Sequence, residues 1–194
     1  MATYLQVVEF HGVAELPPAT RAVYDVRENT ASFGRGPEFV ADASHHSFEL
    51  TTEGHHLSFE LVDEPAPGAL MARELALPAG EYLLRCDRVD FPPGGEAFLH
   101  THQGPGIRVL LFGSIRIETQ GATHEYAPGE PWFESGPDPV YAATHADEAS
   151  AFVRCMVLPR ALQGTPSIRY VRDEDRERPK SQRYTVFLDE PVVL

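Results

Sequence analysis

The chain has 194 residues, 42% of them hydrophobic, which suits one globular domain with extensions. Its 29 acidic and 16 basic residues give a formal net charge of −13, and without a basic stripe this charge argues against a nucleic-acid partner. No apolar run is long enough to span a membrane, and MATYLQVVEF lacks the basic and apolar regions of a secretion signal, so we expect a cytoplasmic protein without a membrane partner.

Short runs of Val, Ile, Leu, Phe and Tyr, separated by Pro and Gly turns, predict an all-β protein with little helix. In chain order, the expected strands are Tyr4–Phe10, Ser47–Leu50, Leu57–Leu61, Met71–Leu77, Tyr82–Phe91, Ala97–His102, Ile107–Phe112, Ser114–Thr119, Thr123–Tyr126, Trp132–Glu134, Val140–Thr144 and Ala151–Leu158. This spacing is typical of a sandwich or barrel.

The chain is expected to form one globular domain with three parts. Residues 1–66 supply N-terminal strands that pack on the barrel, residues 67–160 form the barrel, and residues 161–194 form a polar C-terminal arm. The arm contains Lys180, the only lysine, and ends in the strand-like YTVFLDEPVVL. Such a strand needs a sheet edge to cover it, and that edge could belong to a second subunit, so we expect a homodimer.

The N-terminal part contains a weak internal echo, HHSFEL followed by HHLSFEL, which predicts a hairpin of residues 45–61. Adjacent residues on a strand face opposite ways, so neither His-His pair is expected to act as a chelate. His11 and His124 have no partner nearby in the sequence. Cys86 and Cys155 lie in apolar strands and are expected to be buried small hydrophobes.

The segment FPPGGEAFLHTHQGPG carries the most informative pattern. His100 and His102 are two residues apart on an expected strand, so both imidazoles should point to the same face. Two neutral imidazoles on one face are potential metal ligands. The PPGG turn before them and the QGPG turn after them place the pair near the rim of the barrel.

Residues 91–119 resemble the first motif of the cupin superfamily, G-x5-H-x-H-x3–4-E-x6-G. Gly95 stands five residues before His100, the two histidines occupy their motif positions, and Gly113 follows His102 by eleven residues. The second motif is only partly recognisable, in YAPGEPWFESGPDPVYAAT. The resemblance covers roughly residues 70–160 and implies a jelly-roll β-barrel with N-terminal extra strands, a C-terminal arm and a metal or small-molecule site inside.

Two positions depart from the cupin pattern. The usual glutamate falls on Gly106 and the second-motif histidine falls on Val140, so two of the four usual ligands are missing. Two imidazoles alone make a poor metal site, since catalytic sites usually hold three protein ligands. Glu134 is the candidate third metal ligand, with a surface carboxylate beside a turn as the alternative. His145 is the other candidate, but strict strand alternation places it on the opposite face to Val140, so we expect a surface histidine unless a bulge intervenes.

Strand alternation also places Arg108 inside the barrel if position 106 faces inward. A buried guanidinium needs an anionic partner, either an internal carboxylate such as Glu134 or the carboxylate or phosphate of a substrate. Gln103 at the mouth and Tyr141, which fills the barrel or lines its mouth, complete the expected substrate-binding residues.

Two functions remain open from the sequence. One is a metal-dependent enzyme, oxygenase-like or isomerase/lyase-like, in which His100, His102 and Glu134 hold Fe, Mn, Ni or Zn and the substrate is a small organic molecule. The other is a metal-free binding module in which Arg108 and the histidines capture a small anionic ligand. This fold hosts too many reactions for the resemblance to name the substrate.

Overall fold

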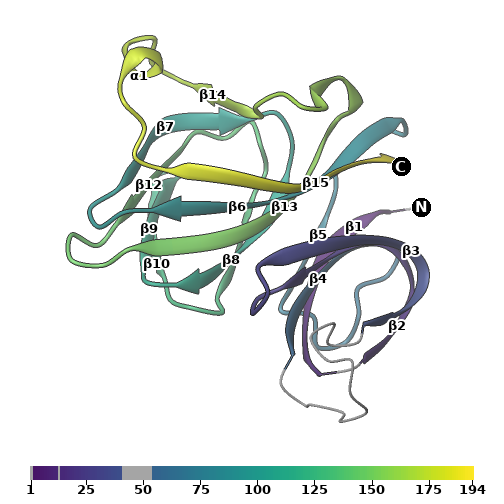
Figure 1. The fold of residues 1–194 in the computed structure, drawn as a ribbon. Coiled ribbons are helices and arrows are strands. Elements are labelled where there is room, and N and C mark those ends of the chain that lie inside the picture. The colour runs from purple at the N-terminus through teal and green to yellow at the C-terminus, as the bar shows by residue number, and fades with distance from the viewer. Residues whose placement is uncertain (1, 13, 41–53) are drawn as a thin grey trace. The chain divides into compact units, whose positions relative to one another are not determined.

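The computed structural model describes residues 2–12, 14–40 and 54–194, with backbone only for 37–40. The regular secondary structure of the described chain is almost entirely antiparallel strand, with a short 3-10 turn, η1 (Arg160–Leu162), and a short helix, α1 (Glu174–Glu177) (Figure 1). This confirms the all-β prediction. Within the described ranges, no helix has the length and apolarity needed to cross a membrane. The chain forms two compact units, unit 1 (Met1–Pro78) and unit 2 (Ala79–Leu194).

Unit 1 is one five-stranded sheet with the strand order β3-β2-β4-β1-β5. Its strands are β1 (Tyr4–His11), β2 (Ala14–Asp25), β3 (Thr30–Val40), β4 (His55–Val62) and β5 (Met71–Glu74). The pairing of β1 with β4 runs from Tyr4 opposite Val62 to His11 opposite His55. The expected strand Ser47–Leu50 and its half of the hairpin lie outside the described residues.

Strands β2 and β3 were not predicted from the sequence. Pro17 and Pro18 interrupt the β2 pattern, and the register between β2 and β3 shifts at this point, between Leu16 and Ala19. Proline cannot donate to a strand ladder, so it is tolerated where the ladder is locally broken. β2 is weakly predicted by local propensity, so we attribute its extended conformation to its long-range pairing with β4, in which Ala22 lies opposite Phe59.

One face of the unit 1 sheet carries a buried charged pair. Arg21 donates from Nε to Glu60 Oε1 at 3.1 Å, and both side chains are almost fully buried. Ser58 Oγ also donates to Oε1 at 2.8 Å, and Gln6 Nε2 donates to Oε2 at 2.7 Å. Arg21 in turn donates to the carbonyl oxygens of Pro17 and Gly36. Both charges are therefore hydrogen-bonded on several sides, which such burial requires.

Unit 2 is a jelly roll. It contains β6 (Glu81–Phe91), β7 (Glu96–His102), β8 (Gly106–Phe112), β9 (Ile115–Thr119), β10 (Ala122–Tyr126), β11 (Pro131–Glu134), β12 (Val140–Thr144), β13 (Ser150–Pro159), β14 (Ile168–Tyr170) and β15 (Arg183–Val193). The sheets have the orders β10-β9-β12-β7-β14 and β11-β8-β13-β6-β15. Strands β6 to β13 thus divide equally between two sheets in jelly-roll order, with β9 and β10 as a pair in the same sheet, as predicted.

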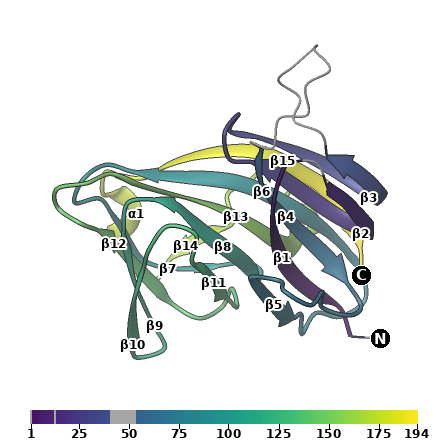
Figure 2. The same cartoon turned by 90° about the horizontal axis from the view of Figure 1, so that it is seen from below.

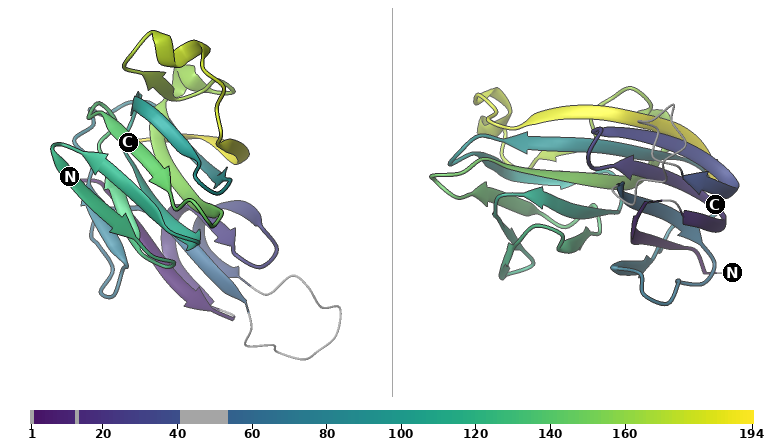
Figure 3. Two further views of the ribbon diagram at one scale, coloured as in Figure 1. Left: turned by 90° about the vertical axis from the view of Figure 1, so that its left-hand side faces the viewer. Right: turned by 60° about the horizontal axis from the view of Figure 1, so that its bottom comes forward.

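The C-terminal part extends both sheets by one strand. β14 pairs with β7, and the expected C-terminal strand forms as β15, which pairs with β6 over most of its length. Figure 2 shows β15, β6 and β13 as neighbours in one layer, and the yellow β15 lies along that layer in the right-hand view of Figure 3. The edge that β15 covers therefore belongs to its own chain.

The two sheets of unit 2 enclose an apolar core at one end and a polar cluster at the other. The core residues come from both sheets: Val89, Phe91, Ala97, Leu110, Ile115, Ile117, Trp132, Val140, Ala142 and Phe152. Cys86 and Cys155 are buried, free and opposite one another on β6 and β13, as expected of buried hydrophobes. Burial raises the pKa of both thiols, so neither has the character of a thiolate nucleophile.

Candidate functional site

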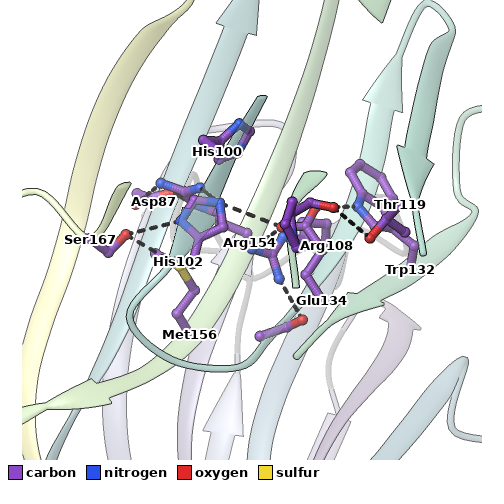
Figure 4. Close-up of polar contacts among 12 residues, drawn as sticks. Asp87, His100, His102, Arg108, Thr119, Trp132, Glu134, Arg154, Met156 and Ser167 are labelled. Atoms are coloured by element: carbon purple, nitrogen blue, oxygen red, sulfur yellow. Dashed lines mark hydrogen bonds and ion pairs between the residues drawn. The ribbon is translucent and has the colours of Figure 1, made fainter. Parts of the chain in front are cut away.

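His100 and His102 project from β7 into the interior of unit 2, as strand alternation predicts (Figure 4). Each is 5% exposed, and their ring centroids lie 4.9 Å apart in an edge-to-face arrangement. His100 Nδ1 donates to the carbonyl oxygen of Phe98 at 2.7 Å, which leaves Nε2 of its neutral ring as an acceptor. Ser167 Oγ lies 3.4 Å from His102 Nδ1.

Both imidazoles are neutral at neutral pH. Burial lowers the pKa of His100, and the nearby Arg154 and Arg108 lower it further, although Glu134 opposes them. Burial also lowers the pKa of His102 well below its ordinary value, and the same two arginines add to the effect. Each ring can therefore accept a hydrogen bond or bind an electrophile without first losing a proton.

The low histidine pKa values predict acid sensitivity of unit 2. The unfolded chain protonates these histidines near pH 6.5, whereas the folded chain does so only at lower pH, so below about 6.5 the unfolded state binds more protons. The stabilising contribution is complete above that pH and is lost as the pH falls through the folded pKa values. Urea unfolding monitored by Trp132 fluorescence between about pH 5 and 8 measures it.

Two matched variants test whether the loss of stability in acid comes from the buried histidines or from other groups of the chain. His102→Gln removes one titrating group, so its free energy of unfolding should fall less on acidification than that of the wild type. His124→Gln, at an exposed position, should show the same pH dependence as the wild type. A wild-type free energy of unfolding that stays level or rises on acidification would contradict the assignment of neutral buried imidazoles.

Glu134 and Arg108 form a buried ion pair beside the histidines. Arg108 Nη2 lies 2.7 Å from Glu134 Oε2, Arg108 is fully buried, and the Glu134 residue is 8% exposed. Trp132 Nε1 donates to Glu134 Oε1 at 3.0 Å, and His102 Nε2 lies 3.4 Å from Oε2. Burial lowers the pKa of Arg108 to about 10, which leaves it charged at neutral pH. Of the two partners considered for Arg108, the structure contains the internal carboxylate.

A second buried pair, Arg154 and Asp87, also lies next to His102. Arg154 donates from Nε to Asp87 Oδ1 at 2.6 Å and from Nη2 to Oδ2 at 3.1 Å, while its Nη1 lies 3.5 Å from His102 Nε2. Burial alone would lower the pKa of Arg154, but Asp87 raises it above the ordinary value. Sequence reasoning missed both residues. The signal was Arg154, the one charge within the apolar strand β13, and Asp87 faces it in the β13–β6 register.

Two cavities meet at this cluster. The inner one holds only about 20 Å³ between the histidines, Arg108, Glu134 and the apolar core. The second, which we call the mouth pocket, has a volume of about 450 Å³, within the range of ligand sites. Its lining is Arg85, Asp87, Arg154, residues 164–167, Ile168, Tyr184, Val186 and Asp189. Arg154 and Tyr184 line both cavities, so they separate the mouth pocket from His102.

The two positions that depart from the cupin pattern cannot supply ligands in this arrangement. A Cβ at Gly106 would lie 2.6 Å from the carbonyl oxygen of Cys155, so β13 approaches too closely for a side chain. Val140 stands opposite His100 in the β12–β7 register and is part of the apolar core. An isopropyl group thus lies beside His100 on the neighbouring strand.

The interior donor set does not fit a divalent ion as it stands. The Glu134 carboxylate is paired with Arg108, and the two guanidinium groups of Arg108 and Arg154 both lie close to His102. Like charge disfavours adding a dication there. Among the residues that the structure describes, the group of three donors close enough to share an ion is Glu9, His11 and His55, in unit 1.

The remaining predicted site residues lie away from the histidine pair. Gln103 Nε2 donates to the carbonyl oxygen of Pro166 at 3.4 Å, at the rim of the mouth pocket. Tyr141 donates to Glu96 Oε2 at 2.7 Å and lines a separate depression with Glu96. His145 is 59% exposed, which agrees with its expected outward direction.

No protein-family model matches the chain, and no curated protein matches it. Among solved structures, the chain is similar to a glycine-to-alanine mutant of salicylate 1,2-dioxygenase from Pseudoaminobacter salicylatoxidans. The identity is 10%, the TM-score is 0.42, and the match covers 95% of this chain and 70% of that chain. At this level the likeness carries no conclusion about substrate or reaction, so the site is interpreted from its own geometry.

Proposed function

We propose that unit 2 is a cupin-type binding module that takes up a small organic anion in the mouth pocket, with Arg154 as the anchor for the anionic group. The observation that carries the proposal is the orientation of this guanidinium. Arg154 lines the mouth pocket, and Asp87 accepts hydrogen bonds from its Nε and Nη2. The hydrogen-bond contact of Nη1 among the described residues is the long one to His102 Nε2, at 3.5 Å, so this nitrogen keeps donor capacity for a ligand.

The lining of the mouth pocket indicates what kind of anion fits. Pro166, Ile168, Tyr184 and Val186 supply apolar wall, whereas Arg85 is already satisfied by Asp189 and by two carbonyl oxygens. A ligand with one carboxylate and a flat apolar body would place its charge on Arg154 and its body against these walls. Ser167 also lines the pocket and could donate or accept a further hydrogen bond there, and its Oγ lies 3.4 Å from Nδ1 of the neutral His102.

Calorimetric titration with acetate, benzoate and 1-naphthoate tests this proposal. Benzoate should bind with a dissociation constant of about 1 mM or lower, and acetate, which lacks the apolar body, should bind at least about 10-fold more weakly. Arg154→Lys keeps a charge beside Asp87 but loses the guanidinium fork, so it should weaken benzoate by about 10-fold or more.

Two further variants make the titration specific. Val186→Glu adds a like charge at an exposed position in the pocket wall and should also weaken benzoate, without touching the buried pair. Arg169→Lys, at an exposed position next to the pocket residue Ile168, should change nothing. Binding that is absent in the wild type, or that is equal in all four proteins, would refute the proposal.

A metal-dependent enzyme is the second candidate, because two neutral imidazoles share one interior face. His100 and His102 would hold the ion, and the Glu134 carboxylate would have to leave its ion pair with Arg108 in order to bind the metal. The test is metal content after reconstitution with Fe, Mn, Ni or Zn. One equivalent that is lost in His100→Ala and in His102→Ala would favour this candidate, whereas an unchanged metal content would exclude it. A cytoplasmic location and a homodimer remain predictions for either function.

A further inference from the structure

Three metal-ligating side chains meet on the sheet of unit 1, remote in sequence from the residues of the proposed function. Glu9 and His11 are two residues apart on β1, so they share a face, and His55 opens β4 directly opposite His11. One nitrogen or oxygen from each side chain lies within 4.8 Å of the other two. We propose that Glu9, His11 and His55 form a binding site for a divalent transition ion, with Zn²⁺ as the best-suited probe.

The contacts among the three side chains are already close to those that an ion requires. Glu9 Oε1 lies 2.6 Å from His55 Nε2, and the rings of His11 and His55 are stacked with their centroids 4.8 Å apart. Donor atoms bound tetrahedrally to zinc lie roughly 3.4 Å from one another, since each bond is about 2.0–2.2 Å long. A small opening of the Glu9–His55 contact would admit the ion, which then replaces their hydrogen bond.

The backbone holds these side chains in place. The β1–β4 ladder is continuous from Tyr4 to His11, and beyond it Gly12 N donates to the carbonyl oxygen of Gly54 at 2.7 Å. The ligands therefore stand on paired strands rather than on loops, which limits the ordering cost of binding. Glu9 and His55 are each about one-third exposed, so an ion and a completing water can reach them without unfolding of the sheet.

Charge and ligand type both favour a cation here, in contrast to the interior cluster of unit 2. Two imidazoles and one carboxylate form a ligand set that suits zinc with one position left for water. The chain as a whole is strongly acidic, with a net charge of −13, and no arginine or lysine is paired with Glu9 in the described contacts. An ion at this point would tie the end of β1 to the start of β4 and so stabilise unit 1.

Equilibrium dialysis of the full-length, tag-free, metal-stripped protein against Zn²⁺, with mass-spectrometric metal analysis, tests the site. The wild type should bind about one equivalent at micromolar free Zn²⁺, and His11→Ala or His55→Ala should weaken binding by about 100-fold, with Glu9→Gln about 10-fold. The melting temperature of the wild type should rise with Zn²⁺, and that of His55→Ala should not.

Two controls distinguish this site from any other histidine site. His124→Ala, at an exposed position in unit 2, should bind Zn²⁺ like the wild type, and so should the double variant His100→Ala/His102→Ala. The proposal is overturned if the wild type holds well under one equivalent at about 100 µM Zn²⁺, or if bound Zn²⁺ survives both His11→Ala and His55→Ala. Neither outcome depends on whether benzoate binds to unit 2.

Discussion

Glu134→Ala should destabilise unit 2 by about 3–5 kcal/mol, because it leaves the Arg108 charge buried without its carboxylate. Trp132 Nε1 and His102 would lose the same partner. The loss of one member of a buried pair costs much more than the pair contributes, since the remaining ion keeps its full desolvation penalty. Urea unfolding followed by the fluorescence of Trp132, the only tryptophan, reports on unit 2 alone.

A second substitution and a surface control test the cause. Arg108→Met in the Glu134→Ala background removes the stranded charge and should restore a large part of the lost stability, which a double-mutant cycle measures. Glu118→Ala removes an exposed carboxylate that pairs with Arg116 at 3.2 Å, and should change stability by no more than about 1 kcal/mol. If Glu134→Ala costs no more than Glu118→Ala, the buried pair does not exist in solution.

Glu60→Ala should have a comparable effect on unit 1, again about 3–5 kcal/mol, because Arg21 is fully buried and Glu60 is its carboxylate partner. The same substitution leaves Ser58 and Gln6 without their acceptor. Unit 1 contains no tryptophan, so the appropriate measurement is amide hydrogen exchange of β1 and β4, whose protection should fall in the variant.

The matched control for unit 1 is Glu15→Ala, at an exposed position on β2. Exchange in β1 and β4 should be the same in this variant as in the wild type. Unchanged protection in Glu60→Ala would show that the buried network contributes nothing to the stability of the sheet.

The strands of unit 2 were predictable because their signals are local, whereas the jelly-roll order was implied by the resemblance to cupins. Pro and Gly turns punctuate strands of even spacing, and the two-residue period of a strand places His100 and His102 on one face. The same period, counted from Gly106, placed Arg108 inside. Each of these inferences needs only the sequence within one strand and its flanking turns, and the structure agrees with all of them.

The contacts that define the candidate sites were not predictable because they join distant strands. Arg154 meets Asp87 across 67 residues, and His11 meets His55 through a strand pairing that no local pattern specifies. His11 has no partner nearby in the sequence. Strand alternation places His55 and His56 on opposite faces, but it does not show which residue of another strand lies beside His55. A charge inside an apolar strand signals a buried partner, but register alone identifies that partner.

A crystal structure of the protein soaked with benzoate tests the central claim most directly, because it shows where the anion lies. The account predicts a carboxylate within hydrogen-bond distance of Arg154 Nη1, with the ring against Tyr184 and Val186 in the mouth pocket. The Asp87–Arg154 and Arg108–Glu134 pairs should persist. A mouth pocket that stays free of benzoate at saturating concentration, or a ligand bound elsewhere on unit 2, would contradict the account.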